Sequence, residues 1–171
     1  MQIGESLLYW SVRLALLLYA ASVVLQLGGS GDAARRTARH CWSLGCGAFL
    51  VHVVAAFGYV HHWSHASAYQ STAEQTAQRL GWDWGGGIYF NYAFTVLWLA
   101  DVVRWWVAPQ YVPPRWYIVG LHTFFILMIF NATVVFGSPV AAWLGGVVLA
   151  ALTAAAIFRV ASQRRTVVPQ S

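Results

Sequence analysis

The feature that most limits how this chain can fold is a succession of apolar runs, each about 20 residues long. The runs cover approximately residues 7–27, 41–62, 87–107, 116–136 and 140–158. A helix needs about 20 apolar residues to cross the roughly 30 Å hydrocarbon core of a bilayer, because each residue adds about 1.5 Å. Hydrophobic residues make up 59% of the chain and charged residues only 9%. The sequence therefore predicts an all-α, polytopic integral membrane protein built as a bundle of five transmembrane helices.

A single domain accounts for this pattern. We expect one transmembrane bundle over residues 1–161 and a short polar C-terminal tail over residues 162–171. The polar segment between the second and third spans also has helical features, because its weakly apolar residues recur at helical spacing, from Tyr69 to Leu80. Ser71 and Glu74 match the S-x-x-E capping box, and Gly81 is a helix terminator. A short amphipathic helix is expected in this loop.

The arginines outside the spans predict the orientation of the bundle, since short cytoplasmic loops collect positive charge. Most of them fall on one side of the predicted membrane: Arg35, Arg36 and Arg39 in the first loop, Arg115 in the third, and Arg159, Arg164 and Arg165 at the C-terminus. The other side holds Glu5 and the longer loop with Glu74, Arg79 and Asp83. We expect a multi-pass protein of the cell membrane, with the N-terminus outside and the C-terminus in the cytoplasm. The net charge of +5 then reports topology and is no sign of nucleic-acid binding.

Polar residues within the spans are the most informative, because a charged residue at a helix centre costs about 2.5–3.5 kcal/mol unless it faces protein or water. By their distance from the span ends, Asp101 and His122 share an inner layer with Cys46. Arg13, Asn91 and Asn131 share an outer layer, and together with Asp101 they are the expected supporting polar core. Asp101 and Arg104 are three residues apart and can pair along one helix face, which leaves His122 free to hydrogen-bond Asp101.

Four of the six histidines lie within the stretch HVVAAFGYVHHWSH, His52–His65. If the second helix continues past His62, the side chains of His61 and His65 project from one face, as paired metal ligands do. His62 and Glu74 are then candidates for the remaining positions of a metal site. The alternative is that these histidines only line the membrane boundary.

Haem offers a different use for histidine, because two imidazoles on different helices can bind its iron from both faces. His52 and His122 are the candidate pair for such a cofactor. Their depths differ by roughly 7 Å in straight helices, and a tilt of about 20° shifts their relative heights. The sequence does not choose between haem b and a transition metal, since imidazole suits iron, copper and zinc.

Two functions of different classes remain open. The first is a membrane redox protein that holds haem or a transition metal through its histidines and serves in electron transport. The second is a non-catalytic subunit that packs against itself or a larger membrane complex, or a small transporter or channel. No G-x-S-x-G, H-E-x-x-H or P-loop motif is present, and the chain has no lysine, which disfavours a hydrolase or a nucleotide enzyme. Whether the protein is an enzyme stays undecided, and the expected partner in every case is the lipid bilayer.

Overall fold

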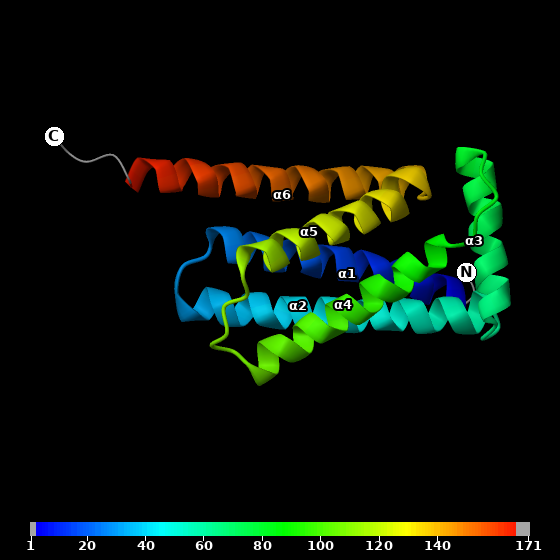
Figure 1. Ribbon diagram of the computed structural model, residues 1–171, viewed down its shortest axis with the longest axis horizontal. Coiled ribbons are helices and arrows are strands. Elements are labelled where there is room, and N and C mark those ends of the chain that lie inside the picture. The colour runs from blue at the N-terminus through cyan, green and yellow to red at the C-terminus, as the bar shows by residue number, and fades with distance from the viewer. Residues whose placement is uncertain (1–2, 167–171) are drawn as a thin grey trace.

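A computed structural model describes residues 3–166 of the chain, and the side chains of residues 4–150 and 152–154. This part of the chain is all-helical (Figure 1). Its elements in order are α1 (Ile3–Gly28), α2 (Gly31–Ala55), η1 (Ala56–Val60), α3 (His65–Leu80), α4 (Gly87–Val107), α5 (Arg115–Phe130), η2 (Asn131–Val135) and α6 (Pro139–Thr166). The two η elements are single π-helical turns. Residues 167–171 of the expected polar tail lie outside the described residues, as do the side chains of the three arginines near the C-terminus.

The first two long helices form an antiparallel hairpin with a very short turn. α1 ends at Gly28, where the Gly29 N–H donates to the Leu25 carbonyl at 2.9 Å, and Gly31 has a positive φ of 87°. The prediction that the arginines of this region lie in a loop is wrong, because α2 already begins at Gly31. Alanine and arginine are strong helix formers, and Asp32 in the first turn favours the helix dipole. Arg35, Arg36 and Arg39 therefore occupy one end of a helix.

The chain changes direction between α2 and α3 at a strained turn, and α3 lies crosswise to α2 (Figure 1). α2 runs into η1, where the His61 N–H donates to the Ala56 carbonyl at 3.1 Å, and the helix then stops. His62 and Trp63 have positive φ values of 48° and 60°, which are unusual for residues with a side chain. The helix does not continue past His62, so the condition for placing His61 and His65 on one helix face is not met.

The helix expected in the following loop is present as α3 and lies across one end of the bundle, at the right of Figure 1. Gly81 ends it with a positive φ of 72°, as predicted. The predicted capping box is wrong, because the cap is Ser64, whose hydroxyl accepts the Ser67 N–H at 3.2 Å. Ser71 lies inside the helix, and Glu74 accepts a hydrogen bond from Gln70 at 3.2 Å. The helix therefore begins about two turns closer to the N-terminus than the capping motif indicated.

Four helices meet in an aromatic core. Tyr19 from α1, Trp42 from α2 and Phe125 from α5 are at most 1% exposed. The rings of Trp42 and Phe125 stack with centroids 5.7 Å apart, and Trp98 from α4 packs edge-on against Phe125 at 5.4 Å. Each buried ring removes a large apolar area from the surroundings, so this cluster fixes the rotation of the four helices.

The outside of the bundle is apolar. Among the described residues, three segments are long and apolar enough to cross a membrane by length and composition, namely Gly4–Gly28, Gly31–Val60 and Arg115–Val135. Large hydrophobic side chains such as those of Leu17, Val96 and Val119 are about 60% exposed. A helix that is apolar on its outer face as well as its inner face is typical of a membrane span. The fold is therefore compatible with a membrane protein.

Candidate functional site

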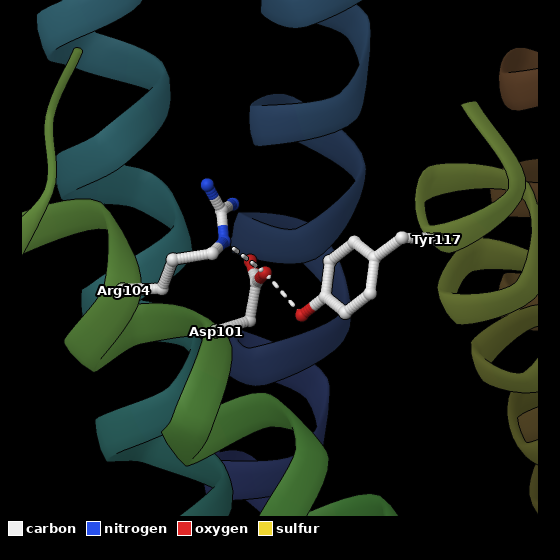
Figure 2. A network of polar contacts seen from close by, with 3 residues as sticks. All are labelled: Asp101, Arg104 and Tyr117. Carbon is white, nitrogen blue, oxygen red and sulfur yellow. Dashed lines mark hydrogen bonds and ion pairs between the residues drawn. The ribbon is translucent and has the colours of Figure 1, made fainter. Parts of the chain in front are cut away.

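A buried carboxylate organises the polar residues at one end of the bundle. Asp101 is 2% exposed, and its Oδ1 accepts the Arg104 Nε–H at 2.9 Å and the Tyr117 hydroxyl at 2.7 Å (Figure 2). The predicted pairing of Asp101 with Arg104 is confirmed. The sequence analysis left His122 free to hydrogen-bond Asp101. In the structure, Tyr117 on α5 makes a hydrogen bond to this carboxylate. A charge-assisted network of this kind ties α4 to α5.

Next to this network is a cavity of about 700 Å³. It opens where the α1–α2 turn and the α4–α5 loop lie together, at the left of Figure 1. The volume lies within the range of about 300–1,000 Å³ that is usual for small-molecule and cofactor sites. Apolar walls are formed by Trp42, Trp105 and Leu121, while His122 and Asp101 add polar groups. We refer to this space as the basic cavity.

Positive charge dominates the lining of the basic cavity. Four arginines line it, Arg35, Arg36, Arg39 and Arg104, against two aspartates, Asp32 and Asp101. The N-terminal turn of α2 is also part of the wall, and the Ser30 side chain makes no capping hydrogen bond there. The free N–H groups and dipole at such a helix end favour an anion.

Two donors in this wall have no acceptor among the described residues. Arg39 Nε is buried without a hydrogen-bond partner, although its guanidinium lies 4.4 Å from the centroid of the Trp106 ring. The indole N–H of Trp42 is likewise buried and unpaired. Buried polar groups are usually satisfied, so unpaired donors beside a cavity favour a ligand that accepts hydrogen bonds.

The histidine predicted to bind haem lies at the inner end of the basic cavity. His122 is partly buried and lines the cavity, and its Nδ1 lies 3.2 Å from the hydroxyl of Tyr19. This contact joins α1 to α5 across the aromatic core. The other candidate, His52, uses its Nδ1–H to donate to the Leu8 carbonyl at 3.0 Å, which leaves its Nε2 for any ligand. No described contact joins His52 to His122.

The histidines of the α2–α3 turn are dispersed. His61 packs edge-on against Phe57, and His65 pairs through Nδ1 with the Tyr92 hydroxyl at 2.8 Å. Desolvation by burial lowers the pKa of His61, and the charge of His62 lowers it further. Within residues 3–166, no group of three or more histidine, cysteine or acidic side chains is arranged to hold a metal ion. The predicted set of His61, His62, His65 and Glu74 is therefore not brought together.

A second, smaller pocket of about 210 Å³ lies near the other end of the bundle, lined mainly by α1, α4, α5, η2 and α6. Its lining is mostly apolar, and Arg13 is its single charged residue. Asn91 also lines this pocket, so the structure unites two residues of the predicted outer layer. Asn131 does not belong to it, because its side chain is exposed and donates to the Leu127 carbonyl at 2.9 Å. We refer to this space as the apolar pocket.

Sequence reasoning missed the arginines of α2 as site residues, since it treated them only as topology signals. A usable signal was present in the spacing of the charged residues. Asp32 lies three residues before Arg35 and four before Arg36, and Arg39 follows these arginines at the same two spacings, which place side chains on one helix face. Tyr19 and Tyr117 gave no such signal, because their partners lie on other helices.

Comparison with protein-family models, curated proteins and solved structures finds no match to this chain.

Proposed function

We propose that this protein is a five-span integral membrane protein that binds an anionic molecule in the basic cavity. The fourth and fifth spans of this proposal are α4, which runs through the bundle beside α2 and α5, and the apolar part of α6, Pro139–Ala154. In this topology the basic cavity opens at the cytoplasmic surface of the cell membrane. The N-terminus and α3 then lie outside.

The observation that carries the proposal is the surplus of positive charge around an open cavity. Positive-inside topology explains why arginines gather at this end of the bundle. It does not explain why four of them line one cavity together with the uncapped N-terminus of α2. Guanidinium groups bind carboxylates and phosphates in a two-pronged geometry. An anion that carries such groups fits both the charge and the unpaired donors.

Thermal unfolding of the purified protein in an uncharged maltoside detergent tests the proposal. Pyrophosphate represents a soluble phosphate ligand, and dihexanoyl phosphatidylglycerol represents a lipid headgroup, with dihexanoyl phosphatidylcholine as the zwitterionic control. We expect one of the two anions to raise the unfolding midpoint. Arg39→Gln should weaken that ligand at least about tenfold, which corresponds to about 1.4 kcal/mol, whereas Arg115→Gln should not, since Arg115 does not line the cavity. Equal responses to all three additives would sink the proposal.

A redox function is the second candidate, and the position of His122 favours it. Haem b carries two carboxylates, which suit the arginines, and its iron needs an imidazole such as that of His122 at the cavity wall. A contact between His122 Nδ1 and Tyr19 would orient the ring so that Nε2 is the ligand. Such a protein is proposed as an electron-transfer subunit of a larger membrane complex or homo-oligomer, with His52 as the alternative ligand.

One absorption spectrum with metal analysis separates the two candidates. A Soret band that is lost in His122→Ala supports haem in the basic cavity. Stoichiometric iron, copper or zinc without that band supports a metal centre, and loss of the metal in His61→Ala and His65→Ala would assign it to the α2–α3 turn. If neither haem nor metal is present, the redox candidate is rejected and the anion-binding proposal is decided by the unfolding experiment alone.

A further inference from the structure

The apolar pocket contains a positive charge that no described residue neutralises. The Arg13 guanidinium lies 3.3 Å above the centroid of the Tyr9 ring and 5.5 Å from that of Trp10. In the part of the chain with described side chains, its Nη2 is buried without a hydrogen-bond partner, and no ion pair involves Arg13. Aromatic rings attract a cation only weakly compared with an anion. A charged residue inside a span is by default the mark of a functional site.

The other polar residues that line the pocket include Asn91, Thr133 and Ser138, and none of the three has a described hydrogen bond or ion pair with Arg13. The Thr133 hydroxyl already donates to the Ile129 carbonyl at 2.7 Å, and the Ser138 hydroxyl accepts the Ala141 N–H at 3.3 Å. Trp98 also lines the pocket, is 2% exposed, and has an indole N–H without an acceptor among the described residues. The pocket thus offers an unpaired cation and an unpaired neutral donor.

The hydrophobic walls and the volume of the apolar pocket indicate the kind of ligand that fits it. They are formed by hydrophobic side chains from six helical elements, including Leu16, Phe94, Met128, Ile129 and Leu144. At about 210 Å³ the pocket is smaller than the range of about 300–1,000 Å³ for drug-sized ligands. This volume suits one short apolar chain, and it is too small for a phospholipid with two acyl chains.

We propose that the apolar pocket binds a single-chain carboxylate of the fatty-acid class, with Arg13 as the counter-ion of the carboxylate and the hydrophobic walls around the chain. The planar guanidinium matches the geometry of a carboxylate. The site is distinct from the basic cavity, since the two have different arginines and lie near opposite ends of the bundle. It does not depend on the function proposed above.

Calorimetric titration of decanoate into the protein in maltoside detergent, at pH 8, tests this site. Decanol serves as the uncharged control and short-chain phosphatidylglycerol as the two-chain anionic control. We expect saturable binding of decanoate and at least tenfold weaker binding of decanol. Arg13→Gln should weaken decanoate at least tenfold, while Arg115→Gln, which changes an arginine outside both cavities, should stay within twofold of the wild type.

A second variant tests the site by its volume and leaves its charge unchanged. Leu144→Trp fills the apolar pocket and retains Arg13, so it should also weaken decanoate at least tenfold. Equal binding of decanoate to wild type and to either variant overturns the proposal. So does Arg13-dependent binding of phosphatidylglycerol without binding of decanoate, because the site would then take a two-chain lipid.

Discussion

Arg104 of the basic cavity and Arg13 of the apolar pocket have opposite surroundings. In the basic cavity, Arg104 is paired with the buried carboxylate of Asp101, which Tyr117 also binds. In the apolar pocket, Arg13 has only aromatic rings beside it among the described residues. The first arrangement links two helices and stabilises the fold, whereas the second leaves a charge to be met by a ligand. The role of an arginine in a helix of this bundle therefore depends on its partner.

The largest change in stability is expected when the carboxylate of Asp101 is removed from the basic cavity. Asp101→Ala leaves Arg104 without its ion pair and Tyr117 without its acceptor. Removal of one member of a buried pair typically costs about 3–5 kcal/mol, and we expect about 3 kcal/mol because Arg104 is 20% exposed. The free energy of unfolding in mixed micelles measures it. Asp83→Ala, a change to an exposed aspartate between α3 and α4, is the control and should alter stability by less than about 0.5 kcal/mol.

The apolar pocket depends on a close approach between α6 and η2. A Cβ at Gly145 would collide with the Thr133 side chain, with 2.6 Å to Thr133 Cβ, whereas a Cβ at the neighbouring Gly146 would meet nothing within 4 Å. Gly145→Ala should destabilise the protein by about 1–3 kcal/mol through overpacking. Gly146→Ala should be neutral or slightly stabilising, because it favours the helix. Equal stabilities of these two variants would show that α6 does not pack on η2 as described.

Replacement of Arg13 should raise the free energy of unfolding, the opposite of the effect expected at Asp101. Arg13→Met removes a charge whose insertion costs about 2.5–3.5 kcal/mol and loses a cation–π contact worth about 0.5–2 kcal/mol. We expect a stability gain of about 1–2 kcal/mol in the absence of ligand, measured in the same unfolding assay. Arg104→Met, the matched change in the basic cavity, should instead destabilise. A loss of stability in both variants would contradict the distinction between the two arginines.

The smallest expected effect concerns the contact between the cavities. Tyr19 lines the apolar pocket, and its hydroxyl meets His122 of the basic cavity. Tyr19→Phe keeps the ring packing and removes one hydrogen bond, which should cost about 1 kcal/mol. His122→Phe in the Tyr19→Phe background should then cost less than in the wild type. Additive effects in this double-mutant cycle would mean that the pair does not interact.

Part of the candidate site followed from the sequence because it is local. Asp101 and Arg104 lie three residues apart on α4, so their pairing needs only helical geometry. The arginines of α2 have a spacing of three or four residues, but the segment was predicted to be a loop, so their shared helix face was missed. The histidine pair of His61 and His65 also relied on local spacing, and it failed because the helix stops in between. Positive φ values at two non-glycine residues gave no warning in the sequence.

The sequence by itself determined the apolar parts of the helices, the glycines at the ends of α1 and α3, and the end of the bundle at which Arg35, Arg36 and Arg39 gather. These properties depend on length, hydropathy and the neighbours within one or two turns. The tertiary structure alone decided that Tyr117 binds Asp101, that Tyr19 meets His122 across 103 positions of sequence, and that Arg13 faces a pocket without a carboxylate. The physical reason is that contacts between helices depend on the rotation and crossing of each helix. Those are fixed here by the packing of Tyr19, Trp42, Trp98 and Phe125, and no local pattern specifies them.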